Sequence, residues 1–148
     1  MYSTYPKKCD VLLVEDNPGD VRLTVEAFNE GEAKHNVHVV KNGQEAMDFL
    51  KKTNNHKGAV TPNLILVDLN MPLMDGREFL KIVKQDDALK KIPVCILSTS
   101  SADKDVSDSY SLHANSYICK PIQLNDYREV IRTLEKYWLK TVELPEPV

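Results

Sequence analysis

The sequence predicts an α/β fold, a doubly wound parallel sheet of five strands with helices on both faces. Short apolar runs alternate along the chain with longer segments in which apolar residues recur at helical spacing. This alternation is the pattern of βα units, and five such units fit into the 148 residues of the chain. A chain of this length can form one domain with a single sizeable core.

Five apolar runs predict the strands of this sheet. The second run is weaker than the others because polar residues interrupt it, and the fifth is short. The predicted strands cover residues 11 to 14, 35 to 40, 64 to 67, 94 to 97 and 116 to 119.

The segment after each run predicts a helix, because apolar residues recur there three or four positions apart. The first helix follows Asn17-Pro18 and runs toward Gly31. Proline at its start is favourable, because proline is common in the first turn of a helix. The inner faces of the other four are predicted from Ala46, Phe49 and Leu50, from Phe79, Leu80 and Val83, from Val106, Tyr110 and Leu112, and from Val130, Ile131, Leu134 and Trp138.

Composition and charge exclude several classes of function. The net charge of -3 argues against a nucleic-acid partner, because phosphate binding needs a clustered excess of Lys and Arg. No apolar stretch approaches a membrane span and the N-terminus lacks a secretory signal, so we expect a cytoplasmic protein with no membrane partner. Cys9, Cys95 and Cys119 are odd in number and widely spaced, which predicts buried free thiols rather than disulfides or a zinc site.

Acidic residues follow two of the predicted strands. The stretch NLILVDLNMPLMDG runs through four apolar residues and then reaches Asp68, and Glu15-Asp16 follows the first strand. Ligand sites in open parallel sheets lie beyond the carboxyl ends of the strands, so these three carboxylates converge if the two strands are neighbours. Because like charges repel, their convergence implies a hard divalent cation such as Mg²⁺.

The fourth and fifth strands add the remaining parts of a phosphate site. Ser98 follows the fourth run and offers a hydroxyl, while Lys120 follows the fifth and offers a positive charge on a flexible stem. A carboxylate beside a metal ion, a lysine and a hydroxyl is equipped to attack a phosphorus atom. The pattern therefore predicts that Asp68 is a nucleophile.

Each of these residues also has an ordinary structural explanation. The acidic pair can cap the following helix, where the helix dipole favours negative charge. Asp68 can belong to a turn, Ser98 to a polar loop, and Lys120 can be a solvated lysine. Their joint placement at the ends of four strands favours the functional interpretation.

With these residues in this order, residues 9 to 138 resemble the receiver domain of two-component response regulators. The family has a flavodoxin-like (βα)5 fold with strand order 2-1-3-4-5, which we therefore expect here. The chain is similar to it in the acidic pair Glu15-Asp16, the phosphoacceptor Asp68, the hydroxyl switch residue Ser98, the aromatic switch residue Tyr117, and Lys120-Pro121, whose peptide bond is usually cis in the family.

The resemblance implies a metal site and a partner. Asp16 and Asp68 would bind Mg²⁺, or Mn²⁺, directly, Glu15 mostly through water, and Asn70 through its backbone carbonyl. A sensor histidine kinase would pass its phosphoryl group to Asp68.

The same resemblance implies a conformational switch. Lys120 and Ser98 would close on the new phosphoryl group, and Tyr117 would then turn inward. That movement would alter the surface made by the fourth helix, the fifth strand and the fifth helix, where partners of such domains bind.

A narrower resemblance lies in the segment IRTLEKYWLKTVELPEP. It is similar to the single-domain regulators paired with bacterial phytochrome kinases, which implies a phytochrome-like kinase and a homodimer. Residues 1 to 8 are then an N-terminal extension and residues 139 to 148 a C-terminal tail that forms a dimer contact. A tail folded back on its own core is the alternative.

Three other functions were weighed against this one. A haloacid-type phosphohydrolase needs an acid two residues after its nucleophile, where this chain has Asn70. A flavodoxin-like cofactor binder needs a phosphate loop after the first strand, where this chain has acids. A receiver-like protein-binding module that is never phosphorylated is the alternative that stays open.

We expect no enzyme, beyond self-phosphorylation from small phosphodonors and autodephosphorylation. Only about ten residues follow the last predicted helix, so we expect no output domain in the same chain and an effect through a protein target that the sequence does not name.

Two departures from the family pattern stand out. His113 occupies a position where receivers commonly have glycine, so we expect the fourth helix to end in a left-handed residue there. The loop over residues 51 to 62 is longer than usual and basic.

Overall fold

The computed structural model describes residues 8 to 31 and 33 to 146, so nearly all of the predicted N-terminal extension lies outside the described residues. The described residues form one parallel sheet with the strand order β2-β1-β3-β4-β5, which confirms the predicted fold class. Each strand begins and ends within one residue of its predicted bounds. The strands are β1 (Asp10–Val14), β2 (Asn36–Val40), β3 (Leu64–Asp68), β4 (Val94–Ser98) and β5 (Ser116–Cys119).

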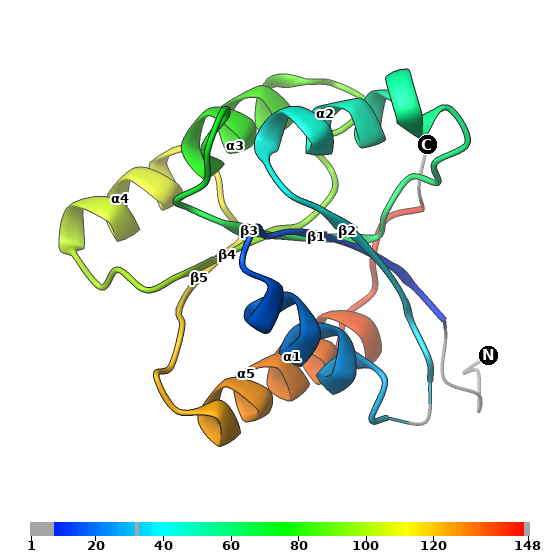
Figure 1. Cartoon of the computed structure of the whole chain (residues 1–148). Helices are drawn as coiled ribbons and strands as arrows, with labels where there is room; N and C mark the ends of the chain where they lie inside the picture. The colour runs from blue at the N-terminus through cyan, green and yellow to red at the C-terminus, as the bar shows by residue number, and fades with distance from the viewer. Residues whose placement is uncertain (1–7, 32, 147–148) are drawn as a thin grey trace.

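Helices cover both faces of the sheet, two on one side and three on the other (Figure 1). Helices α1 (Pro18–Phe28) and α5 (Leu124–Lys136) lie side by side below the sheet in this view. Above it lie α2 (Gly43–Lys51), α3 (Gly76–Gln85) and α4 (Asp103–Ser111). A short 3-10 helix, η1 (Asn54–His56), interrupts the loop after α2.

Three helices begin at side chains that cap them. Asn17, Asn42 and Asp75 each precede a helix and accept a hydrogen bond from the backbone N–H three residues on, at 2.8 to 3.0 Å. The cap of α1 is therefore Asn17, and the structural explanation of Glu15-Asp16 as capping residues is wrong. Neither acid is needed to begin the helix.

The register of the sheet aligns the carboxyl ends of the strands. Val14, the last residue of β1, lies opposite Val67 of β3, one residue before Asp68. Asp68 in turn lies opposite a residue of β4 that precedes Ser98, and Ser98 lies opposite the end of β5. The residues predicted for the site therefore lie together at the carboxyl edge of the sheet.

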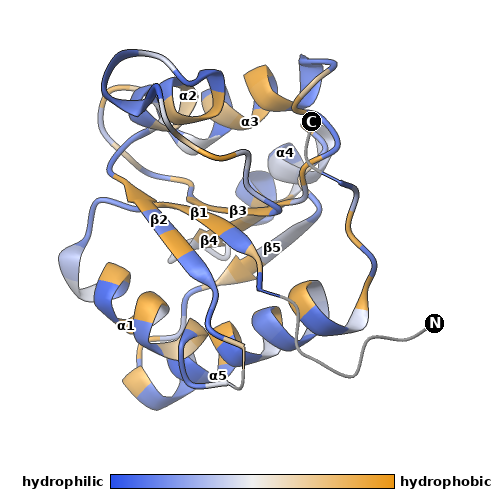
Figure 2. Cartoon of the chain, turned by 90° about the vertical axis from the view of Figure 1, so that its right-hand side faces the viewer, coloured by the Kyte–Doolittle hydropathy of each residue, from blue (hydrophilic) through white to orange (hydrophobic). Residues whose placement is uncertain are grey.

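The sheet separates two apolar cores, and the hydrophobic residues of its strands and of the inner faces of the helices meet there (Figure 2). The core beneath α2 and α3 includes Leu12, Ile65 and Phe79, each fully buried. The core beneath α1 and α5 includes Phe28 and Ile131. Because β1 and β3 contribute to both cores, the acids that follow them are attached to rigid parts of the molecule.

The C-terminal segment packs on its own domain. Helix α5 continues into a π-helical turn, η2 (Tyr137–Thr141), in which Leu139 is buried. Trp138 and Leu144 pack against the core beneath α1 and α5, as the alternative of a tail folded back on its core predicts. Tyr137 nevertheless stays half exposed.

A buried hydrogen-bonded group ties this segment to the start of the sheet. His35 accepts a hydrogen bond from the backbone N–H of Cys9 through Nδ1 at 3.1 Å, so its Nε2 carries the proton that is donated to Glu135 at 3.1 Å. Lys140 lies 3.9 Å from the same carboxylate. The histidine is thus a structural residue that joins the residue before β1 to α5.

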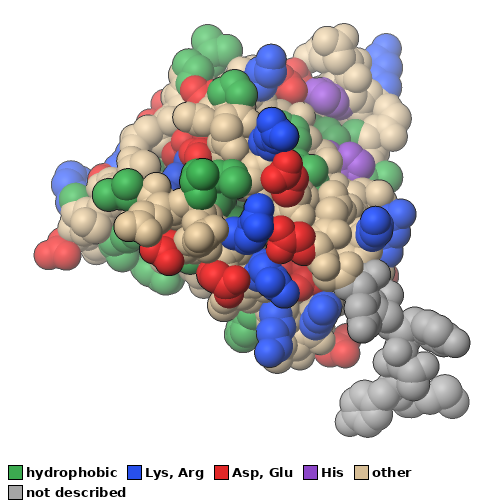
Figure 3. All heavy atoms as spheres, turned by 60° about the horizontal axis from the view of Figure 1, so that its bottom comes forward, with side chains coloured by type: hydrophobic (Ala, Val, Ile, Leu, Met, Phe, Trp, Pro, Cys, Tyr) green, Lys and Arg blue, Asp and Glu red, His purple; other side chains and the backbone are tan. Residues whose placement is uncertain are grey.

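Acidic and basic side chains are interleaved on the face formed by α1 and α5 (Figure 3). Glu30 pairs with Arg128 and Arg132, and Arg22 pairs with Glu26 along α1. Charges of both signs are therefore mixed on this face. None of the helices within the described ranges is long and apolar enough to cross a membrane.

Two expectations are wrong and one is confirmed. Cys9 and Cys95 are buried, as predicted, but Cys119 is exposed because it lies at the end of the edge strand β5. The described residues contain no cis peptide bond, so the bond before Pro121 is trans. His113 has a φ of 72°, the left-handed conformation predicted after α4.

Gly76 fixes the distance between α3 and the end of β3. A Cβ at this position would lie 2.7 Å from the backbone oxygen of Asp68 and 2.8 Å from Cα of Leu69. Gly76 also donates its N–H to the backbone oxygen of Leu69 at 2.9 Å. Only a residue without a side chain allows the helix to begin so close to Asp68.

We expect Gly76→Ala to lower the free energy of unfolding by about 1 to 3 kcal/mol, because the new methyl group meets backbone that cannot move away. In an unobstructed helix the same change is stabilising by up to about 1 kcal/mol, so the sign itself is diagnostic. Urea denaturation measures the difference.

Gly58→Ala is the matched control, since a Cβ there has no heavy atom within 4 Å. It should change stability by no more than about 0.5 kcal/mol. A Gly76→Ala protein as stable as this control would show that the close approach to Asp68 is not needed.

Candidate functional site

Three carboxylates converge at the carboxyl edge of the sheet. One oxygen from each of Glu15, Asp16 and Asp68 lies within 4.8 Å of the others. Among residues 8 to 31 and 33 to 146, this is the one cluster of three or more potential metal ligands from His, Cys, Asp or Glu. Glu15 is 2% exposed, Asp16 is exposed, and Asp68 is partly buried. The convergence predicted from the strand ends is confirmed.

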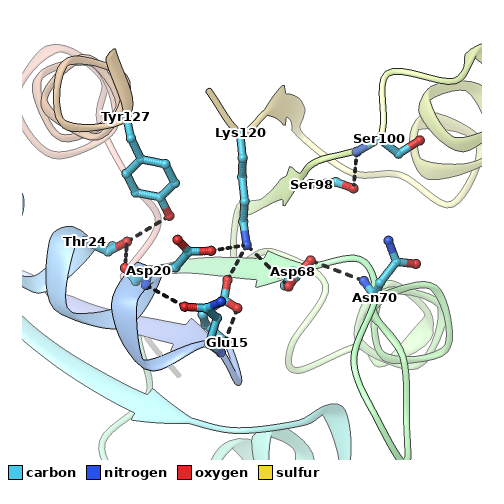
Figure 4. A network of polar contacts seen from close by, with 10 residues as sticks. Glu15, Asp20, Thr24, Asp68, Asn70, Ser98, Ser100, Lys120 and Tyr127 are labelled. Carbon is cyan, nitrogen blue, oxygen red and sulfur yellow. Dashed lines mark hydrogen bonds and ion pairs between the residues drawn. The ribbon is translucent and has the colours of Figure 1, made fainter. Parts of the chain in front are cut away.

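Lys120 enters the same space from the end of β5. Its ammonium Nζ donates to Oε2 of Glu15 at 2.6 Å and to Oδ2 of Asp68 at 3.4 Å, and its side chain is only 6% exposed (Figure 4). Its backbone N–H donates to the backbone oxygen of Ser98, which fixes the start of the side chain. The structural explanation of a solvated lysine is therefore wrong.

A third acid contacts Lys120 that the sequence analysis did not identify. Asp20, in the first turn of α1, accepts from Nζ at 3.0 Å through Oδ2. It lies four residues after Asp16, near the acidic pair in the sequence. That spacing is the signal that was available in the sequence.

The charges of this group shift the pKa values of its buried members. Burial raises the pKa of Glu15 to about 7, and the charge of Asp68 adds to the rise although the hydrogen bond from Lys120 opposes it. Burial acts to lower the pKa of Lys120, but its hydrogen bond to Glu15 and the charges of Glu15 and Asp68 outweigh burial, so its pKa lies above the ordinary value. Lys120 is a permanent cation at neutral pH.

Ser98 and Tyr117 both contact the loop between β4 and α4. The hydroxyl of Ser98, which is fully buried, accepts from the backbone N–H of Ser100 at 3.1 Å. The hydroxyl of Tyr117 donates to the backbone oxygen of Ser100 at 2.8 Å, and its ring packs against the core beneath α2 and α3. The two predicted switch residues are thus joined through one intervening residue.

Two further residues hold this loop and were not predicted. The hydroxyl of Ser100 donates to Asp105 at 2.5 Å, and Asp105 forms an ion pair with Arg77 of α3. The hydrogen bond from Ser100 and the charge of Arg77 hold the pKa of Asp105 below its usual value. These contacts of Ser100, Asp105 and Arg77 join α3 to the first turn of α4.

The donor set at the strand ends suits a hard divalent cation. The oxygens of Glu15, Asp16 and Asp68 are ligands that Mg²⁺ and Mn²⁺ accept, and Lys120 supplies only one positive charge to this group of acids. Asn70 lies beside them, since its backbone N–H donates to Oδ1 of Asp68 at 3.3 Å. The residues present therefore fit such a metal ion.

Comparison with known proteins agrees with this geometry. The chain matches the family described as the response regulator receiver domain over residues 11 to 132. It is 42% identical over 135 residues to response regulator Rcp1 of Synechocystis sp., covering 91% of this chain and 92% of that protein.

Solved structures give the same result. The crystal structure of the phosphorylated cyanobacterial phytochrome response regulator RcpA is 42% identical, with a TM-score of 0.92, over 95% of this chain and 100% of that one. The Mn²⁺-bound form of Rcp1 is 41% identical, with a TM-score of 0.89, over 93% of this chain and 99% of that one.

Lys120→Met should lower the free energy of unfolding by about 3 kcal/mol without divalent metal, because it leaves the buried carboxylate of Glu15 without its cation. Added Mg²⁺ should restore part of this loss, since a metal ion replaces the missing positive charge. Urea denaturation with and without Mg²⁺ measures both effects.

Lys104→Met is the control, because Lys104 pairs with Asp108 on α4 and is 83% exposed. Its effect should stay within about 0.5 kcal/mol. Equal losses for the two variants would contradict the role of Lys120 as the cation that stabilises this site.

Proposed function

The chain belongs to the response regulator receiver domain family, and from that premise we propose that Asp68 accepts a phosphoryl group from a sensor histidine kinase. The observation that carries the proposal is the position of Asp68, at the end of a buried strand and 3.4 Å from the ammonium of Lys120. A carboxylate held this way is rigid, partly exposed and beside a fixed cation.

The proposed step is an in-line transfer of the phosphoryl group. A carboxylate oxygen of Asp68 attacks the phosphorus of a phosphohistidine on the kinase, an O–P bond forms, and the P–N bond breaks. The imidazole ring of the kinase takes up one proton from water and leaves as neutral histidine. The product is an acyl phosphate on Asp68, whose new negative charge lies near Lys120.

We place the metal ion among Glu15, Asp16, Asp68 and the backbone carbonyl of Asn70. When bound, Mg²⁺ or Mn²⁺ neutralises the charge on the transferred oxygens and on the acids around them. The acidic group supports this placement, and so does the Mn²⁺ that the relative Rcp1 is described as binding.

The contacts around Ser100 support a conformational switch. Ser98 would release the N–H of Ser100 to reach the phosphoryl group, and Tyr117, bonded to the same residue, would respond. Because Tyr117 is a residue of β5 whose hydroxyl contacts the loop that precedes α4, its response would alter the face formed by α4, β5 and α5. The structure then represents one of two states of this face.

The relatives indicate the kind of kinase. RcpA is described as a phytochrome response regulator, and the likeness covers almost the whole of this chain, so we propose a phytochrome-like histidine kinase as its phosphodonor. A kinase that draws its phosphoryl group from ATP works in the cytoplasm, where we place this protein.

The chain acts as a signalling domain and not as an enzyme on a separate substrate. Its own chemistry is limited to self-phosphorylation from small donors and to loss of the phosphoryl group. A module that only binds partners would not need Lys120 and the acids to be assembled as they are.

Asp68→Asn should abolish phosphorylation, because an amide is not a nucleophile toward phosphorus. We expect wild-type protein to gain one phosphoryl group from acetyl phosphate and Mg²⁺, and none after chelation of the metal, as measured by intact mass. Asp87→Asn, on a side chain that is 96% exposed, should behave as wild type. An undiminished adduct in Asp68→Asn would place the phosphoryl group elsewhere.

We further propose that two copies associate through a groove between β5 and α5. The groove has a volume of about 610 Å³ and an apolar lining that includes Ile118, Val130, Tyr137 and Trp138. It lies at one edge of the sheet, where β5 is the last strand among residues 8 to 31 and 33 to 146. An apolar groove at such an edge supports a second copy as its occupant.

Tyr137→Ser should raise the dissociation constant of the dimer at least about ten-fold, because the exposed ring is a large apolar contact whose loss leaves the core intact. Sedimentation velocity over a range of concentrations measures it. Val60→Ser, at an exposed residue outside the groove, should leave association unchanged. Equal association of both variants with wild type would remove the groove from the interface.

A further inference from the structure

The ammonium group of Lys120 is shared among three carboxylates, and Asp20 is one of them (Figure 4). A lysine ammonium has three N–H donors, so Glu15, Asp20 and Asp68 together account for all of them. A phosphoryl group on Asp68 must therefore compete for a cation that is already fully engaged.

Of the three carboxylates bonded to Lys120, Asp20 alone lies outside the cluster of potential metal ligands. Glu15 and Asp68 belong to the group of oxygens within 4.8 Å of one another, together with Asp16, and Asp20 does not. A divalent cation among those three acids would neutralise Glu15 and Asp68 but not Asp20. Asp20 is then the carboxylate that remains as the counter-ion of Lys120.

The backbone of Asp20 is held in place from both sides. Its N–H donates to Oδ1 of Asn17 at 3.0 Å, and its carbonyl oxygen accepts from the hydroxyl of Thr24 at 2.8 Å. That hydroxyl lies 3.1 Å from the hydroxyl of Tyr127 on α5, and both residues are buried. Asp20 therefore cannot follow Lys120 far into the site.

We infer that Asp20 is a positioning residue that holds Lys120 toward α1 and competes with the phosphoryl group on Asp68 for its ammonium. The inference rests on the proposed function, because it concerns what the phosphoryl group must overcome. Asp20 weakens the attraction of the site for an anion at Asp68. It also strengthens the attraction of the site for a divalent cation, because it adds negative charge and restrains the ammonium.

Asp20→Asn tests this competition, because the amide keeps the shape and a hydrogen-bond acceptor for Lys120 but removes the charge. The probe is beryllofluoride, an anionic phosphoryl analogue, titrated at saturating Mg²⁺ and followed by fluorine NMR. We expect its affinity to rise about three- to ten-fold in the variant. The affinity for Mg²⁺ alone, measured by calorimetry, should fall by a similar factor.

The opposite signs separate charge competition from damage to the structure, which would weaken both ligands. Asp20→Glu restores the carboxylate and should return both affinities toward wild type. Asp126→Asn makes the same change of net charge at an exposed acid in the first turn of α5, and should leave both within about two-fold.

Beryllofluoride affinity that is unchanged or lower in Asp20→Asn, while wild type binds it, would overturn the inference and leave the proposed function standing. Absence of Mg²⁺-dependent binding in wild type, or equal binding in Asp68→Asn, would instead contradict the proposed function. The two failures are therefore distinguishable in one set of titrations.

Discussion

The placement of one lysine ammonium among buried and half-buried carboxylates governs the structure of this site. Glu15 is almost fully buried and close to Asp68, an arrangement that is unfavourable unless a cation lies between the charges. Lys120 supplies that cation at 2.6 Å from Glu15 and 3.4 Å from Asp68. Three acids and one lysine still leave negative charge in excess, so the same group that needs Lys120 also attracts a divalent metal ion.

The fold provides this arrangement through features remote from the chemistry. The parallel register aligns the ends of β1, β3, β4 and β5, and each end carries one component of the site. Gly76 lets α3 begin against the backbone of Asp68, and the ion pair of Arg77 with Asp105 joins that helix to the loop that holds Ser98. Asp68, Lys120 and Ser98 therefore belong to one connected structure.

The sequence was sufficient for the fold and for Glu15, Asp16, Asp68 and Lys120, because apolar periodicity locates the strands and parallel strands align their ends. It was insufficient for contacts that depend on how separate helices pack. Asp20 meets Lys120 only because α1 lies beneath the end of β5, and its role was not apparent from spacing alone. The exposure of Cys119 depends likewise on β5 being an edge strand.

The central claim is that these acids form a divalent metal site completed by Lys120, where Asp68 can accept a phosphoryl group. Anomalous diffraction from crystals soaked in Mn²⁺ tests it most directly, because the signal locates the ion itself. We predict one strong peak bounded by Asp16, Asp68 and the backbone carbonyl of Asn70, with Lys120 still paired with Asp20. A peak elsewhere, or no peak at this edge under saturating Mn²⁺, would contradict the claim.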